Sequence, residues 1–346
     1  MNRKYILHIG RDYSFEILRP LQSEILARGD KCVWYRASEA VNSARFKDDE
    51  NVISDIDEIS RYPADAVFTP GNSVPSFLQG LKVQVFHGLE WKKKGHFRIR
   101  DFFDLYCTHG PITTEKFNEL ASKHKNFLVR ETGWPKLDPL FSTRSFELPT
   151  DRKVVLYAPT FSPSLSSAFD CFEEIIKLSK EESWYWIIKF HPMMDQDVVK
   201  RFKSAQHQYL KVIEGVDVLP LMQRADVMLS DTSSVIGEFQ LLGKPVVTYR
   251  NFKPDTGLID VSKVSQLKDA LTYALSAPDD LSRRIQESIR RLHPYRDAKS
   301  SSRVLNVVEE ILDNHIRPRK KRPRNLYRNY KLNKALGYKP AWLKLF

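Results

Sequence analysis

The sequence predicts an α/β protein with two domains, each built on a doubly wound parallel sheet, followed by a basic C-terminal tail. Three observations lead to this prediction. Short runs rich in β-branched and aromatic residues alternate with amphipathic stretches through most of the chain. The alternation breaks once, in an irregular Pro-containing segment at residues 135–152. The chain has 346 residues, which is enough for two domains and more than one compact core usually holds.

The first half of the chain contains five strand candidates, each a short apolar run. They are residues 5–9, 31–35, 65–68, 83–86 and 104–107. Amphipathic stretches predict helices over 15–27 and 113–122. Strands that alternate with helices favour a parallel sheet, because a parallel connection needs a long crossover. We therefore expect a first domain over residues 1–135 and a linker over residues 136–152.

The second half resumes the alternation after the linker. Strands are predicted over 154–157, 184–190, 209–213, 227–229 and 246–249. Helices are predicted over 168–180, from 195, from 233, and over 263–276, 279–291 and 299–315. These elements predict a second domain over residues 153–316. Ligands of such folds lie beyond the carboxyl ends of the strands, so we expect a site in a central cleft that both domains face.

Residues 317–346 hold most of the excess positive charge. The chain carries a net charge of +12, and this tail contains eleven Lys or Arg and no acidic residue. Without the tail, 44 basic and 43 acidic residues remain, so the body lacks the charge of a nucleic-acid-binding fold. Leucine and aromatic residues interleave with the basic ones, which predicts a short amphipathic helix near 325–337, with flexible flanks, on an anionic membrane surface. A disordered, solvated extension fits the same composition.

Several protein classes lack support in the sequence. No apolar run reaches about 18 residues, so we expect no transmembrane helix. The three cysteines are far apart, which fits a reducing cytoplasm and disfavours a disulfide framework or a zinc site. The dinucleotide-binding pattern GxGxxG and the P-loop pattern GxxxxGKS/T are both absent. We therefore expect no cofactor and no obligatory metal.

A strand that ends in polar residues marks the first candidate site. The apolar run 227–229 is followed by Ser230 and Asp231, then by three hydroxyl residues, Thr232, Ser233 and Ser234, and then by a helix. Hydroxyls and free N–H groups at the start of a helix can bind a phosphate. A simple helix cap by Asp231 or Thr232 explains the same pattern. One turn inside the helix, Glu238 could accept ribose hydroxyls or could lie on a solvated face.

Two histidines follow predicted strands, where function is expected in α/β sheets. His87 comes after the run 83–86, and His191 comes after the run 184–190. An imidazole can act as a general base or can bind phosphate oxygens at neutral pH. An ordinary loop histidine is the alternative at each position. Three further histidines, His8, His96 and His109, fit either interpretation.

An ordered set of motifs connects these positions to a known family. The motifs are His87-Gly88 with Lys92, Gly133-Trp-Pro-Lys-Leu-Asp138, Leu156-Tyr-Ala-Pro-Thr-Phe161, Lys189-Phe-His-Pro192, and Ser230-Asp-Thr-Ser-Ser234 with Gly243-Lys-Pro245. Together they resemble the CDP-glycerol glycerophosphotransferases, which are the teichoic-acid primases and polymerases and have a GT-B fold. The resemblance covers roughly residues 83–250, about half of the chain. Thr232 departs from the tyrosine that members of this family tend to carry there.

The resemblance implies roles for individual residues. It makes His87 and His191 the two catalytic histidines, and it makes Gly88 and Lys92 contacts to the acceptor or to phosphate. The implied donor-binding residues are Lys189, Thr160, Ser230, Asp231, Thr232, Ser233, Ser234 and Glu238. From chemistry alone, His87 suits a base that deprotonates an acceptor hydroxyl, while His191 and Lys189 suit the binding of phosphate oxygens.

These observations lead to one expected function and to alternatives. We expect transfer of glycerol phosphate, or of a related polyol phosphate, from a CDP-activated donor to a hydroxyl of a cell-envelope glycan or lipid-linked acceptor. A GT-B glycosyltransferase or a nucleotide-sugar 2-epimerase that uses a UDP-sugar is the first alternative, and a non-catalytic membrane-associated scaffold is the second. The expected partners are the donor, the acceptor and an anionic membrane surface, with no nucleic acid. The expected location is cytoplasmic, peripherally at the inner face of the cell membrane.

Overall fold

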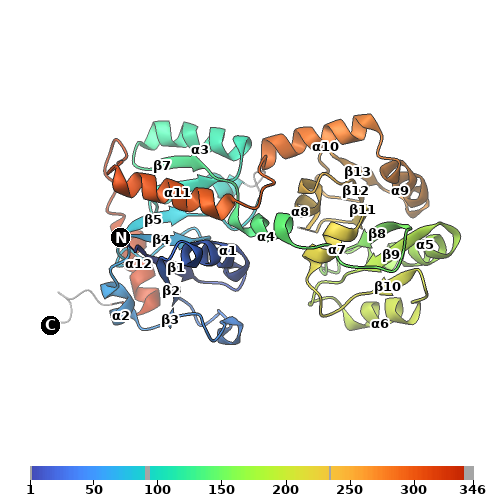
Figure 1. Cartoon of the computed structure of the whole chain (residues 1–346), viewed down its shortest axis with the longest axis horizontal. Helices are drawn as coiled ribbons and strands as arrows, with labels where there is room; N and C mark the ends of the chain where they lie inside the picture. The colour runs from blue at the N-terminus through green and yellow to red at the C-terminus, as the bar shows by residue number, and fades with distance from the viewer. Residues whose placement is uncertain (1, 90–93, 234, 339–346) are drawn as a thin grey trace. The chain divides into compact units, whose positions relative to one another are not determined.

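The computed structural model describes residues 2–89, 94–233 and 235–338 (Figure 1). The chain forms two compact units. Unit 1 consists of Met1–Asp138 together with Leu292–Phe346, and unit 2 consists of Pro139–Arg291. Each unit contains its own parallel sheet, so each is described by itself.

Unit 1 is built on seven parallel strands in the order β3-β2-β1-β4-β5-β6-β7. The strands are β1 (Lys4–Ile9), β2 (Lys31–Arg36), β3 (Val52–Ile53), β4 (Ala66–Thr69), β5 (Leu81–Gln84), β6 (Leu105–Thr108) and β7 (Leu128–Glu131). The central strands β1 and β4 are buried almost throughout. Burial on both faces explains why these strands have no alternation of polar and apolar residues in the sequence.

Helices and short 3₁₀ segments surround this sheet. They are α1 (Ser14–Ala27), η1 (Ser43–Arg45), α2 (Ile56–Arg61), η2 (Lys94–Phe97), α3 (Pro111–His124), η3 (Pro135–Leu137), α11 (Ser300–Asp313) and α12 (Leu326–Leu336). In α1, Ile17, Leu18, Leu21 and Ile25 are buried. Their spacing of three to four residues places them on one helical face, which packs on the sheet.

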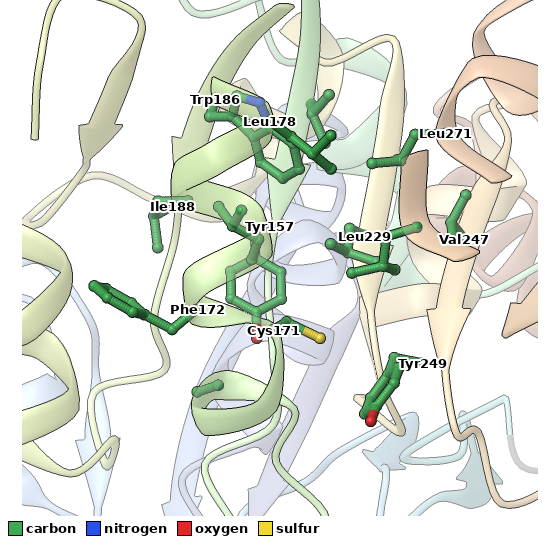
Figure 2. Close-up of a cluster of buried hydrophobic side chains, with 14 of the residues drawn as sticks. Tyr157, Cys171, Phe172, Leu178, Trp186, Ile188, Leu229, Val247, Tyr249 and Leu271 are labelled. Carbon is green, nitrogen blue, oxygen red and sulfur yellow. The ribbon is translucent and has the colours of Figure 1, made fainter. Parts of the chain in front are cut away.

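Unit 2 is built on six parallel strands in the order β10-β9-β8-β11-β12-β13. The strands are β8 (Lys153–Tyr157), β9 (Trp184–Ile188), β10 (Leu210–Val212), β11 (Val227–Ser230), β12 (Val246–Tyr249) and β13 (Leu258–Val261). Figure 2 shows part of the core on one face of this sheet, where Trp186 and Leu229 from the strands face Leu178 and Leu271 from helices. Burial of each such large side chain contributes about 1.5–3 kcal/mol.

The remaining helices belong to unit 2, and two of them, α4 and α10, span the residues where the chain passes between the units. The elements are α4 (Asp138–Ser142), α5 (Ala168–Glu181), α6 (Gln196–Ser204), α7 (Val218–Arg224), α8 (Val235–Leu241), η4 (Val264–Gln266), α9 (Leu267–Leu275) and α10 (Asp279–Leu292). The predicted fold class of two α/β parallel-sheet domains is confirmed. The short strands β3, β7 and β13 and the helices α2 and α7 were not predicted, because their apolar patterns extend over only a few residues.

The chain returns from unit 2 to unit 1 earlier than the sequence analysis predicted. The second domain was expected to run to residue 316, whereas the structure places the chain from Leu292 onward in unit 1. Several contacts hold this returning segment. Both carboxylate oxygens of Asp138 accept hydrogen bonds from the backbone at the start of α11, from Ser300 N and Ser301 N, each at 2.7 Å. His293 Nε2 accepts the backbone N–H of Trp134 at 2.9 Å.

The C-terminal tail contains the predicted helix, α12, but its preceding flank is bonded to unit 1. Lys320 N donates to Lys125 O at 2.7 Å, and Arg322 forms an ion pair with Asp104 at 3.4 Å. After the helix, the rings of Tyr338 and Phe77 stack with centroids 4.3 Å apart. The flank was predicted to be flexible, whereas the structure attaches it to the sheet domain. Residues 339–346 of the predicted tail lie outside the described residues.

Candidate active site

Each sheet has one point where the strand order reverses, and polar residues gather at its carboxyl edge. In unit 2 the reversal lies between β8 and β11, and in unit 1 it lies between β1 and β4. Connections leave such a pair of strands in opposite directions, which opens a crevice between the two loops. Thr160 and Asp231 follow the two strands in unit 2. The motif residues therefore stand where this fold usually binds ligands.

Asp231 fixes the loops around the crevice of unit 2. Its side chain is 1% exposed. One carboxylate oxygen accepts hydrogen bonds from Thr160 N at 2.9 Å and from Thr232 N at 2.6 Å. The other accepts from Ser167 N and Ser167 Oγ, both at 2.9 Å. Because both of its oxygens accept hydrogen bonds, the carboxylate holds the loop that follows β8 against the turn that follows β11.

Neighbouring polar contacts reinforce this arrangement. Ser230 Oγ donates to Ala158 O at 2.6 Å and is fully buried. Asn251 Nδ2 donates to Asp231 O at 2.6 Å. Sequence reasoning missed Asn251 and Ser167. The position of Asn251 just after the strand 246–249 was a usable signal, whereas Ser167 lies in a loop without any periodic pattern.

The hydroxyl residues after Asp231 are partly accessible. Thr232 and Ser233 are half-buried, and Ser234 lies outside the described residues. The Asp231 carboxylate accepts the N–H of Thr232 within the turn that precedes α8, and its two oxygens otherwise accept hydrogen bonds from Thr160 and Ser167. The helix that follows, α8, has seven residues, so hydroxyl and N–H donors matter more here than the helix dipole.

Glu238 is buried within α8, with 7% of its surface exposed. This excludes the solvated-face interpretation that the sequence had left open. Its contact with a ribose stays a prediction.

His191 lies at the carboxyl end of β9 in a defined tautomer. The backbone N–H of Met193 donates to His191 Nδ1 at 3.1 Å, so the neutral ring carries its proton on Nε2. The ring also stacks on Phe161, with centroids 4.5 Å apart and planes 26° apart. Phe161 is next to Thr160, and this connects His191 to the loop that Asp231 holds. Sequence reasoning gave Phe161 no role of its own.

Lys189 precedes His191 by two residues. Its backbone N–H donates to Tyr157 O at 2.9 Å, and its side chain is half-buried. Within the described part of the chain, its ammonium group has no ion-pair partner. The Nε2–H donor of His191 and the ammonium group of Lys189 therefore lie on the same segment after β9.

His87 in unit 1 has the opposite tautomer. Its Nδ1 lies 3.1 Å from Pro70 O. A carbonyl oxygen can only accept, so Nδ1 carries the proton and Nε2 holds a lone pair. The ring is exposed and lies 5.6 Å from the ring of Tyr13. A lone pair on an exposed imidazole is what a general base needs.

The backbone turns sharply just before His87. Strand β5 ends at Gln84, and Phe86 adopts a φ of 59°, an uncommon value for a bulky residue. The Phe86 ring is buried, and its carbonyl accepts the indole N–H of Trp134 at 3.4 Å. Strained residues of this kind cluster at functional sites. Gly88 follows the turn, and Lys92 lies outside the described residues.

The histidines that the sequence left undecided lie in or near the core of unit 1. His8 is buried and hydrogen-bonds Thr69 Oγ1 at 2.9 Å, and burial lowers its pKa to about 4. His109 is buried beside Phe86, at a ring distance of 5.2 Å, and burial holds its pKa well below the ordinary value. His96 stacks on Phe86 at 4.9 Å. His96 and His109 therefore pack against Phe86, in the turn that precedes His87.

Residues of the motif 133–138 stabilise the fold around the site. Gly133 has a φ of 80°, and a side chain there would meet Ser300 Oγ at 2.5 Å. Trp134 supports Phe86, and Asp138 holds the start of α11. Of the residues in the described ranges, no group of three or more His, Cys, Asp or Glu is placed to hold a metal ion.

Comparison with known proteins places this chain among related sequences and folds. Residues 84–255 match the family model described as CDP-Glycerol:Poly(glycerophosphate) glycerophosphotransferase. The teichoic acid glycerol-phosphate primase of Bacillus subtilis (strain 168) is 24% identical over 238 residues, which cover 62% of this chain and 61% of that protein. The teichoic acid ribitol-phosphate polymerase TarL of Staphylococcus aureus is 26% identical over 222 residues, which cover 56% of this chain and 38% of that protein. The chain spans about three fifths of the length of the primase.

Solved structures show a similar fold. The wall teichoic acid polymerase TagF is similar with a TM-score of 0.60 and 14% identity, over 91% of this chain and 90% of that chain. A UDP-N-acetylglucosamine 2-epimerase is similar with a TM-score of 0.64 and 15% identity, over 93% of this chain and 99% of that chain. At such identities the likeness concerns the fold alone, which is GT-B-like in both comparisons. The family match covers the strand ends that carry His87, His191 and Asp231, and the chain belongs to the CDP-glycerol:poly(glycerophosphate) glycerophosphotransferase family.

Proposed function

We propose that the protein transfers glycerol phosphate, or a related polyol phosphate, from a CDP-activated donor to a hydroxyl of a cell-envelope glycan or lipid-linked acceptor. The observation that carries this proposal is the pair of opposite tautomers. His87 offers a lone pair on Nε2, because its Nδ1–H donates to Pro70 O. His191 offers an N–H on Nε2, because its Nδ1 accepts from Met193 N. A phosphoryl transfer to a hydroxyl needs both a base and a donor to phosphate oxygens.

His87 acts as the base in this proposal. Nε2 takes the proton of the acceptor hydroxyl as its oxygen bonds to the phosphorus of the polyol phosphate. The bond from that phosphorus to the bridging oxygen breaks, and CMP leaves. The imidazolium that forms keeps its Nδ1–H on the Pro70 carbonyl, which holds the ring in one orientation. Gly88 and Lys92, from the same motif, are proposed to contact the acceptor or its phosphate.

Unit 2 binds the donor in this proposal. His191, Lys189 and the hydroxyls of Thr232, Ser233 and Ser234 contact the diphosphate, whose negative charge increases on the leaving CMP. Thr160, Ser230 and Asp231 contribute by fixing the loops, as their hydrogen bonds support. Glu238 is proposed to accept ribose hydroxyls from its buried position in α8.

A donor screen tests the proposal. The purified protein is incubated with CDP-glycerol, CDP-ribitol and a set of UDP-sugars, each with a glycerol phosphate-primed acceptor, and the released nucleotide is identified. CMP release from a CDP-polyol, coupled to a lengthened acceptor, is the expected result. Release of UDP, or epimerisation of a UDP-sugar at C2, would instead establish the alternative function. A protein that binds no CDP-polyol by calorimetry would act as a scaffold.

We also propose that the protein lies at the cytoplasmic face of the cell membrane. Leu326, Tyr327 and Tyr330 on α12 are exposed, and the helix carries basic residues among them. Amphipathic aromatic residues and positive charges together favour the interface of an anionic leaflet. No helix in the described part of the chain has the length and apolarity needed to cross a bilayer.

A further inference from the structure

A cavity of about 710 Å³ lies at the amino edge of the sheet in unit 1. One side is formed by the starts of β5 and β7, at Leu81 and Leu128, and by Asp65 and Asp104, which precede β4 and β6. The other side is formed by residues 316–322 of the tail. All strands of this sheet are parallel, so their amino ends share one edge. His87 follows the carboxyl end of β5, at the opposite edge, and the cavity is therefore separate from the candidate active site.

The cavity carries an excess of positive charge. The basic lining residues are Arg317, Arg319, Lys320, Lys321 and Arg322, against two acidic ones, Asp65 and Asp104. Asp65 accepts the backbone N–H of Lys4 at 2.8 Å, and Asp104 accepts that of Lys82 at 2.9 Å and pairs with Arg322. Among the described residues, Arg317, Arg319, Lys320 and Lys321 have no ion-pair partner. These four side chains can therefore contact an anionic ligand.

The basic segment is held in place before any ligand arrives. The backbone N–H of Lys320 donates to Lys125 O at 2.7 Å, and the Arg322 guanidinium donates to Phe102 O. Pro318 and Pro323 restrict the backbone on either side. A preorganised segment loses less conformational entropy on binding than a free tail does. The structure therefore favours a defined binding pocket over nonspecific electrostatic attraction.

Exposed apolar side chains lie on α12, the helix that follows residues 316–322 in the chain. Leu326, Tyr327 and Tyr330 are 73%, 68% and 64% exposed. Their positions within four residues of α12 place them on adjoining faces of the helix. Leu332, on the same helix, packs against the core of unit 1 and fixes the helix there. Exposed apolar groups gain nothing from a small anion or a polar polymer, but they gain from a lipid surface.

We infer that the amino edge of the unit 1 sheet and residues 316–322 form a pocket for the phosphate-bearing headgroup of an anionic phospholipid. Arg317, Arg319 and Lys321 contact the headgroup, while Leu326, Tyr327 and Tyr330 enter the interface. The cavity is larger than one phosphate ion needs and falls within the range of ordinary ligand pockets. This inference deepens the membrane association proposed above, because it replaces charge attraction by a specific binding site.

Two double variants of the full-length protein test it. Arg319→Ala with Lys321→Ala removes two positive charges from the pocket, and Lys331→Ala with Lys334→Ala removes two from α12. Binding is measured by co-sedimentation with vesicles of phosphatidylglycerol and phosphatidylcholine. Because hydrogen bonds to charged groups add to simple charge attraction, the pocket variant should lose about tenfold more affinity than the helix variant. Equal losses would mean that charge number alone governs binding, which would overturn the pocket.

A soluble probe separates a headgroup from a small anion. Dihexanoyl phosphatidylglycerol, kept below its critical micelle concentration, should raise the melting temperature of the wild type and not that of the pocket variant. An equal rise with inorganic phosphate would assign the pocket to a small anion and contradict the lipid assignment. CMP release with a water-soluble acceptor should be unchanged in the pocket variant. If the wild type released no CMP, the proposed transfer would be refuted, while the measured lipid binding would still support the pocket.

Discussion

At the scale of single residues, one hydrogen bond sets the chemistry of each proposed catalytic histidine. The Nδ1 atom of His87 faces a carbonyl oxygen, and the Nδ1 atom of His191 faces a backbone N–H. The same side chain therefore presents an acceptor in one unit and a donor in the other. The sequence predicted both histidines and their different roles, and the partner of each Nδ1 atom gives those proposed roles a physical basis.

This difference predicts separate effects on donor binding. His191→Ala should weaken the binding of CDP-glycerol about 10- to 100-fold, because a hydrogen bond to a charged phosphate is lost. His87→Ala should leave donor affinity unchanged, because the base contacts the acceptor hydroxyl. Calorimetric titration of each variant with CDP-glycerol provides the measurement. Equal weakening by the two substitutions would show that the assignment of roles is wrong.

At the scale of elements, the loops after β8 and β11 form one rigid assembly around Asp231. The substitution Asp231→Asn replaces one acceptor oxygen by an amide group that faces N–H donors. Each donor left unsatisfied costs about 1–3 kcal/mol, so the free energy of unfolding of unit 2 should fall by that order. Donor affinity should fall as well, because the loop at Thr160 and Ser167 is no longer held.

Hydrogen exchange measures this effect locally. The amides of residues 158–167 should exchange faster in Asp231→Asn than in the wild type, while those of α6 stay protected. The control is Asp195→Asn, which alters a cap at the start of α6 and should leave the loop unchanged. Unchanged protection of the loop in Asp231→Asn would contradict its structural role.

The sequence predicted most of the long elements but could not predict how polar groups are buried. The run 83–86 was expected to be a strand, whereas β5 occupies Leu81–Gln84. Lys82 and Gln84 are buried in that strand because each finds backbone carbonyl acceptors, Gly80 O for Lys82 and Gly71 O for Gln84. Phe86 instead forms the turn before His87. These partners come from the folded chain, so no local pattern could reveal them.

The tail also depends on partners that are distant in the sequence and that no local pattern predicts. The Leu and aromatic residues interleaved with basic ones predicted α12, and Gly337 with a φ of 75° ends it as a left-handed C-cap. The docking of the flank depends on Lys125 and Asp104, about two hundred residues earlier in the chain. For the site, the motifs located the strand ends, but the function of Asp231 as a loop clamp required the structure.

At the scale of the whole molecule, buried imidazoles link the stability of unit 1 to pH, and His109 acts in the same direction as the two described next. Burial lowers the pKa of His8 and of His293 to about 4, from an ordinary value of 6.5. The unfolded chain binds these protons below about pH 6.5, whereas the folded chain binds them only below about pH 4. The free energy of unfolding of unit 1 should therefore fall as the pH decreases from 6.5 to 4.

A single substitution isolates this contribution. His8→Gln keeps a group that can hydrogen-bond Thr69 and removes the titration, so the variant should lose less stability between pH 7 and pH 4.5 than the wild type. Protection of β1 and β4 amides from hydrogen exchange reports on unit 1 alone. The same loss in both proteins would exclude His8 as a source of the acid sensitivity.

The central claim is that His87 supplies the base for transfer from a CDP-polyol. The most direct measurement follows labelled glycerol from CDP-glycerol into a primed acceptor under single-turnover conditions, for the wild type, His87→Ala and His124→Ala. His124 is exposed on α3 and serves as the matched control. The account predicts that His87→Ala slows transfer about 10²- to 10⁴-fold with an unchanged melting temperature, while His124→Ala transfers like the wild type. Near wild-type transfer by His87→Ala would contradict it.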